Sequence, residues 1–110
     1  APLVSHIYEL GLVEAISIPQ TECFEGALQF ARTEGIVPAP EPTHAIAAAV
    51  REAMACKESG EEKVILTALC GHGHLDLAAY ETFLSGQMVD LDLPDSAIQE
   101  AMQNVPKIEG

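Results

Sequence analysis

The chain contains no tryptophan, only two tyrosines and three phenylalanines, and only five basic residues. Because aromatic side chains are so few, the core must be built from small aliphatic residues, within a hydrophobic fraction of 48% that is ordinary for a globular protein. Five Lys+Arg against 17 Asp+Glu give a net charge of -12, which repels phosphate backbones and anionic lipid headgroups. We therefore expect neither nucleic acid nor a membrane surface as a partner.

Long apolar runs and paired cysteines are also missing. No uncharged apolar run approaches the roughly 18 residues that a membrane span needs, and the amino end lacks the basic start and apolar core of a signal peptide. The three cysteines, Cys23, Cys56 and Cys70, have no CxxC spacing, and their odd number does not suggest a disulfide framework. A reducing cytoplasm is the expected location.

The order of apolar segments and turn residues predicts an α/β fold. β-branched residues at 12–18, stopped by a proline, and an apolar run at 64–69 predict two strands, the second buried on both faces as in a parallel sheet. Helices are expected at 5–10, from a Thr21 cap to Gly35, from about Pro42 to Lys57, and at 75–84. The expected architecture is a small three-layer unit with a short, mainly parallel sheet flanked by helices.

The length of 110 residues allows one domain with one modest core. Residues 1–86 are predicted to form this single α/β domain, and residues 87–110 to form a tail. In the tail, apolar and acidic residues alternate at 89–93, which is typical of an edge strand, and a short helix is expected after a cap at Asp95 or Ser96. Either this edge strand or a second copy of the chain would extend the thin sheet.

The segment Cys70-Gly71-His72-Gly73-His74 links the second predicted strand to a predicted helix. In open α/β folds, ligands lie beyond the carboxyl ends of strands, and a glycine-rich turn exposes backbone N–H groups at a helix start. The segment lacks the third glycine of a dinucleotide fingerprint and the lysine of a phosphate loop. It is therefore either a ligand-facing turn or a strand-to-helix turn that needs small residues for its geometry.

Other side chains near this turn also allow two interpretations. His72, His74 and His44 are possible metal ligands, but zinc usually takes three or four protein ligands and only Cys70 is near, so no metal site is predicted. Cys70 is either a thiol nucleophile activated by His72 or a small packed residue. Glu34 stands at a helix end where the dipole disfavours an acid, and is either a buried functional carboxylate or a solvated charge.

Two stretches carry a resemblance to a known family: Ala-Arg-Thr-Glu-Gly-Ile-Val-Pro-Ala-Pro-Glu-Pro-Thr-His-Ala at 31–45, and Cys-Gly-His-Gly-His at 70–74. Together they resemble the carboxyl-terminal part of tryptophan synthase beta chains of the second, longer type. That family implies a fold-type II pyridoxal-phosphate enzyme, which joins serine and indole to make tryptophan. The likeness runs over most of residues 1–85.

The resemblance implies four cofactor-binding positions. Cys70 stands where the family has a serine whose hydroxyl meets the pyridine nitrogen of pyridoxal phosphate. Gly71 and Gly73 match the turn glycines that admit the cofactor ring, and Glu34 matches a glutamate near the cofactor and substrate. A thiol is a weaker donor than a hydroxyl.

The family's Schiff-base lysine and phosphate loop lie earlier in its sequence, and none of Lys57, Lys63 and Lys107 matches that lysine. No catalytic residue is therefore assigned, and the chain alone is expected neither to bind the cofactor nor to catalyse. Two interpretations remain open. In the first, the chain is part of an enzyme and docks to, or continues from, a missing amino-terminal portion. In the second, it is an orphan domain that acts as a non-catalytic binding or self-associating module, most simply a homodimer.

Overall fold

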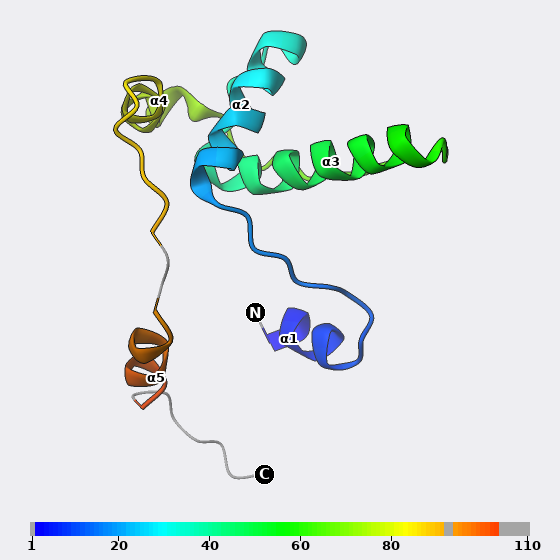
Figure 1. Cartoon of the computed structure of the whole chain (residues 1–110), viewed down its shortest axis with the longest axis vertical. Helices are drawn as coiled ribbons and strands as arrows, with labels where there is room; N and C mark the ends of the chain where they lie inside the picture. Colours follow the sequence, from blue (N-terminus) through cyan, green and yellow to red (C-terminus); the bar gives the residue numbers. More distant parts are fainter. Residues whose placement is uncertain (1, 92–93, 104–110) are drawn as a thin grey trace.

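The computed structural model describes residues 2–91 and 94–103, and the regular secondary structure in these ranges is helical. The helices, in chain order, are α1 (Pro2–Glu9), α2 (Gln20–Glu34), α3 (Pro40–Ser59), the 3-10 helix η1 (Gly73–Leu75), α4 (Leu77–Leu84) and α5 (Asp95–Gln103). α2 packs against α3 and α4, whereas α1 and α5 stand away from this group (Figure 1).

The two long helices end within two residues of their predicted ends, but both begin earlier than the sequence predicts. Both end at a glycine in the left-handed conformation, Gly35 with φ 71° and Gly60 with φ 73°. The end at Gly35 was predicted, whereas α3 was predicted to end at Lys57 and continues to Ser59. α3 begins at Pro40, two residues before the predicted start, so the connector between α2 and α3 is shortened to residues 36–39. α2 begins at Gln20, directly after Pro19, so the prediction that Thr21 is its N-cap was wrong.

Two small clusters of buried side chains hold the helices together. Phe24 and Ala27 of α2 pack with Tyr80 of α4 in the first cluster. In the second, Cys23 of α2 packs with Ala47 of α3 and with a residue of the preceding segment, Ile18. Alanine and glycine at the α2–α3 crossing allow the two backbones to approach closely, as expected for a chain with few large side chains.

The predicted α/β fold with a parallel sheet is wrong. Residues 12–18 and 64–69 form no strand, and the single β-bridge among the described residues joins Pro38 to His72 in antiparallel orientation. The apolar run at 64–69 was expected to be buried, yet Val64 is 99% exposed and Leu66 is 96% exposed. A strand needs a neighbouring strand to satisfy its backbone, and the described part of this chain does not supply one.

The tail predictions have mixed outcomes. The predicted short helix is confirmed as α5, which begins at Asp95 after Pro94. The possible edge strand at 89–93 is absent from the described residues 89–91, and residues 92–93 lie outside the described ranges. The division between a domain at 1–86 and a tail at 87–110 stays a prediction.

The chain is far more open than a compact protein of its size. Its radius of gyration is 17.1 Å, whereas a compact domain of this length has about 13 Å. Its accessible surface is 8878 Å², whereas a compact monomer of 11.7 kDa exposes about 5,900 Å². No residue of α1 or α5, both fully described, is buried. None of the helices in the described ranges combines the length and apolarity needed to cross a membrane.

Candidate functional site

The two stretches that carry the family resemblance meet in space. The turn at residues 70–74 lies against the connector at residues 36–39 through two backbone hydrogen bonds. Ala39 N donates to Gly71 O at 3.2 Å, and Gly73 N donates to Val37 O at 2.8 Å. The connector leaves the carboxyl end of α2, and the turn leads into α4, so these bonds join the ends of both helices.

Both glycines of the turn are required by the backbone itself. Gly71 has φ +105°, a conformation that residues with a side chain rarely adopt. Gly73 is buried, and a Cβ atom on it would collide with the carbonyl oxygen of Pro38. The open interpretation of a turn that needs small residues for its geometry therefore has direct support, while the role of Gly71 and Gly73 toward the cofactor stays a prediction.

A buried tyrosine fixes the connector from the other side. The hydroxyl of Tyr80 donates a hydrogen bond of 2.6 Å to the carbonyl oxygen of Pro38, and Tyr80 is only 5% exposed. Its ring meets the ring of Phe24 edge-on, with centroids 5.0 Å apart. Burial raises the pKa of Tyr80, which keeps the hydroxyl protonated as a donor. α2, the connector and α4 are thus tied together beside the turn.

Cys70 and Glu34 lie on the surface at the edges of this junction. Cys70 is an exposed free thiol at the end of the extended segment that precedes the turn. Glu34 is the last residue of α2 and is exposed, so of its two interpretations the structure supports the solvated charge. Their cofactor-binding roles stay predictions.

Of the three histidines considered as metal ligands, His72 and His74 contact each other, whereas His44 pairs with Cys23. His44 Nδ1 lies 3.1 Å from the thiol sulfur of Cys23. The ring of His72 accepts a hydrogen bond of 3.3 Å from the backbone N of His74, which places His72 as the cap of η1. Within residues 2–91 and 94–103, no three His, Cys, Asp or Glu side chains come together as a metal site.

Lys63 does not offer an uncharged amine. Lys63 forms ion pairs with Glu52 at 3.0 Å and Glu61 at 3.3 Å, and these hydrogen bonds raise its pKa, so the ammonium form is favoured. Lys57 lies in the last turn of α3 and far along the chain from the turn at 70–74. Lys107 lies outside the described residues. Cys70, exposed beside the turn, has a donor group that could meet one edge of a pyridoxal ring, and this contact stays a prediction.

Sequence reasoning missed the residues that organise the junction. Tyr80 has the helical spacing of an ordinary core residue, and nothing in the sequence distinguishes its hydroxyl. The pairing of Cys23 with His44, and the contact of Asp90 with Thr21 at the start of α2, join positions that are distant in the sequence. Periodicity describes single elements and carries no signal for such contacts.

Comparison with known proteins agrees with the resemblance. No family model matches the chain. Over 90 residues the chain is 60% identical to tryptophan synthase beta chain 2 of Aquifex aeolicus. These matched residues make up 82% of this chain and 21% of that protein. The chain is 53% identical over 89 residues to tryptophan synthase beta chain 2 of Methanosarcina acetivorans, covering 81% and 20%. For the Pyrococcus furiosus protein of the same name, identity is 45% over 106 residues, covering 96% and 24%.

The chain therefore spans about a fifth of the length of the curated relatives it matches. Identities of 45–60% over most of the chain show a family relationship. The matched region lies in the carboxyl-terminal part of the relatives. The chain belongs, as a carboxyl-terminal segment, to the family of the tryptophan synthase beta chains.

Proposed function

We propose that this chain is the carboxyl-terminal part of a pyridoxal-phosphate-dependent enzyme that makes tryptophan from serine and indole. By itself the chain is inactive, and it works only when joined to or docked on an amino-terminal portion. The observation that carries the proposal is the open surface of the chain. About 3,000 Å² more surface is accessible than a compact monomer of this mass exposes, and this chain matches only a fifth of its relatives.

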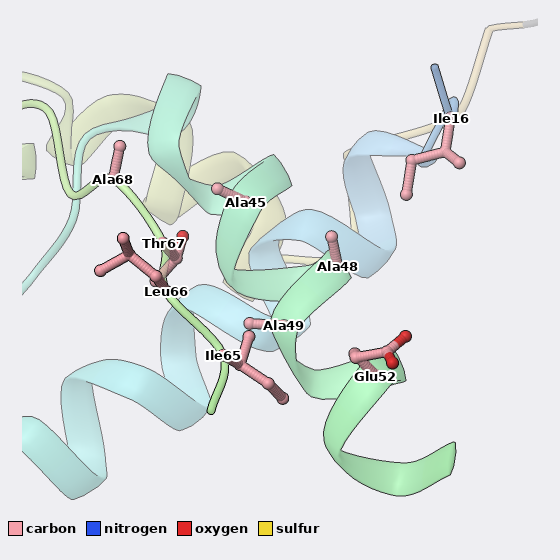
Figure 2. Close-up of a pocket in the computed structure, with 9 residues that line it drawn as sticks. All are labelled: Ile16, Ala45, Ala48, Ala49, Glu52, Ile65, Leu66, Thr67 and Ala68. Carbon is pink, nitrogen blue, oxygen red and sulfur yellow. The ribbon is translucent and has the colours of Figure 1, made fainter. Parts of the chain in front are cut away.

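Part of the exposed apolar surface lies beside the candidate site. The extended segment 64–69 leads directly into the turn, and its residues Val64 and Leu66 are almost fully exposed. Between this segment and α3 lies an apolar groove of about 430 Å³, formed mainly by alanines of α3, Ile16 and residues 65–68. Figure 2 shows Ala45 and Ala49 pointing from α3 toward the extended segment. Exposed apolar side chains that adjoin a groove are typical of an interaction site, so we place a partner surface here.

In the joined protein, this chain supplies one wall of the cofactor site. The thiol of Cys70 would meet the pyridine nitrogen of pyridoxal phosphate, and the turn glycines leave room for the ring edge. Bound pyridoxal phosphate supplies the electron sink that β-replacement chemistry on serine requires. The phosphate contacts and the lysine that binds the aldehyde come from the amino-terminal portion, since Lys63 is held in ion pairs.

The same proposal gives the partner and the location. The partner surface is that of the amino-terminal portion, and a homodimer of this chain is the outcome expected if the chain is an orphan domain instead. The three thiols, none of them in a disulfide, suit a reducing cytoplasm.

A fusion tests the proposal. We would replace the matched 90 residues of the Aquifex aeolicus relative with this chain, then measure pyridoxal phosphate binding by absorbance and tryptophan formation from serine and indole. We expect cofactor binding and activity in the fusion and neither in the chain alone. The amides of residues 64–69 should also exchange more slowly in the fusion than in the chain alone, because the partner covers them. A fusion that folds but neither binds the cofactor nor makes tryptophan would contradict the enzyme assignment.

A pair of matched variants locates the docking surface. Leu66→Asp places a charge on a fully exposed position, so it should leave the isolated chain intact and prevent docking in the fusion. Met102→Asp makes the same kind of change on α5, where the residue is 61% exposed, and should leave cofactor binding intact. Light scattering on the isolated chain separates the alternatives, because a dimer that Leu66→Asp dissociates would support the orphan module and count against docking.

A further inference from the structure

The carbonyl of Pro38 is the point at which the connector, the turn and α4 meet. It accepts the hydrogen bond from the Tyr80 hydroxyl, and it faces the Cα atom of Gly73 so closely that no side chain fits between them. The residues on either side of it, Val37 and Ala39, make the two backbone hydrogen bonds to the turn. The orientation of this one peptide group therefore sets where the turn lies.

We propose that Tyr80 is a positioning residue for the cofactor site: by holding the Pro38 carbonyl, it fixes the turn and therefore the place of the Cys70 thiol. This inference rests on the proposed function, because it assumes that Cys70 faces the cofactor. Among the described residues, the Tyr80 hydroxyl hydrogen-bonds to the connector at Pro38 and not to Cys70 or another side chain of the turn.

The tyrosine is suited to this task because its ring is buried and packed against other rings. Tyr80 is 5% exposed and packs edge-on against Phe24, which is 4% exposed. Phe24 is stacked in turn on Phe83, with ring centroids 5.6 Å apart. The hydroxyl is therefore delivered from a rigid aromatic cluster that spans α2 and α4. Functional groups of a site need to be held to within about 0.5 Å, which requires such a supporting layer.

The hydrogen bond matters because both of its groups are buried. Pro38 is among the residues that are fully buried, so without the hydroxyl its carbonyl would lose its side-chain partner away from water. The peptide would then rotate toward another donor. Such a rotation moves the Ala39 N–H, which belongs to the same peptide group as the Pro38 carbonyl, and it displaces the Val37 carbonyl of the neighbouring peptide. Both bonds to the turn are therefore loosened.

The variant Tyr80→Phe removes only the hydroxyl and keeps the ring packing, so the chain should still fold. Tyr8→Phe is the matched control, because it makes the same change at a tyrosine that is 57% exposed on α1. In the isolated chain we would measure amide hydrogen exchange by NMR. We expect exchange of the Gly73 and Ala39 amides to accelerate about fivefold to tenfold in Tyr80→Phe, as the loss of one buried hydrogen bond implies, with α3 amides unchanged and no change in Tyr8→Phe.

In the fusion with the relative's amino-terminal portion, Tyr80→Phe should weaken pyridoxal phosphate binding by a similar factor and shift the cofactor's absorbance, whereas Tyr8→Phe should change neither. Unchanged exchange at Gly73 and Ala39 would overturn the inference. Faster exchange with unchanged cofactor affinity and absorbance would also overturn it, because Tyr80 would then be only structural. A fusion with wild-type Tyr80 that binds no cofactor would overturn the proposed function. The exchange measurement in the isolated chain needs no cofactor, so it tests the role of Tyr80 separately from the proposed function.

Discussion

The carboxylate of Asp90 caps the amino terminus of α2 at Thr21, although 69 residues separate the two positions. Thr21 N donates to Asp90 Oδ1 at 2.9 Å, and the Thr21 hydroxyl donates to Asp90 Oδ2. Beside them, Gln20 Nε2 donates to Val89 O at 2.7 Å. α2 has no side-chain cap of its own, so the tail supplies the negative group that the helix start favours.

Replacing Asp90 should therefore destabilise α2 in a pH-dependent way. Hydrogen bonds from Thr21 lower the pKa of Asp90 below its usual value of 3.8. A carboxylate with a lowered pKa adds stability above the pKa of the unfolded chain, and this stability is lost as the pH falls through the folded pKa. At pH 7 we expect the melting temperature to be highest for the wild type, lower for Asp90→Asn and lowest for Asp90→Ala, because asparagine keeps part of the cap.

Thermal melts followed by circular dichroism between pH 7 and pH 2.5 check this prediction. The difference between wild type and Asp90→Asn should shrink toward zero as the pH falls below about 3.9, the ordinary value for an unfolded aspartate. Glu100→Gln on the exposed face of α5 is the control and should behave as wild type. A difference that stays constant with pH would show that the carboxylate charge does not contribute.

Two glycine-to-alanine substitutions should have opposite effects. Gly26 lies within α2, where a Cβ atom would reach Ala47 Cα at 3.5 Å, an ordinary van der Waals contact. Gly26→Ala should therefore stabilise the chain by up to about 1 kcal/mol through helix propensity. Gly73→Ala should destabilise it by about 1–3 kcal/mol, because the new methyl group collides with the Pro38 carbonyl. Urea unfolding of the wild type and both variants gives the two changes in the free energy of unfolding. Changes of the same sign would contradict the assigned contacts.

The helices could be predicted from the sequence because their signals are local. Apolar residues at helical spacing, a proline near the start and a glycine just past the end mark α2 and α3, and each signal acts within a few residues. The start of α2 was misplaced for the same reason: its cap, Asp90, lies far away along the chain and is invisible to a local pattern.

A sheet was wrongly predicted because hydrophobicity does not identify the surface against which an apolar segment packs. The apolar run at 64–69 was interpreted as a buried strand of this chain, yet Val64 and Leu66 face solvent in the structure. The pattern indicates a need for burial, and it does not say which polypeptide provides it. Likewise, the glycines of the turn were singled out from the sequence as ligand-facing, but only the structure shows the backbone reasons for them, which are the positive φ of Gly71 and the contact of Gly73 with Pro38.

The three cysteines should react with a thiol reagent in a fixed order. Cys70 is exposed and Cys56 is partly buried, whereas Cys23 is 1% exposed and burial raises the pKa of its thiol. Because the thiolate is the reactive form, Cys23 should react last, and its rate should rise only at higher pH. Labelling followed by mass spectrometry gives the order. Rapid labelling of Cys23 at neutral pH would mean that the α2–α3 packing opens readily.

Restoring the family's serine at Cys70 should strengthen cofactor binding in the fusion. A hydroxyl is a stronger hydrogen-bond donor than a thiol and makes a shorter bond to a ring nitrogen, so Cys70→Ser should raise the affinity for pyridoxal phosphate by about 1 kcal/mol, or roughly fivefold. Cys56→Ser, on α3, is the matched control and should leave the affinity unchanged. The dissociation constant from an absorbance titration decides the matter. Equal affinities for the fusion with cysteine and with serine at position 70 would remove the support for a contact between this residue and the cofactor ring.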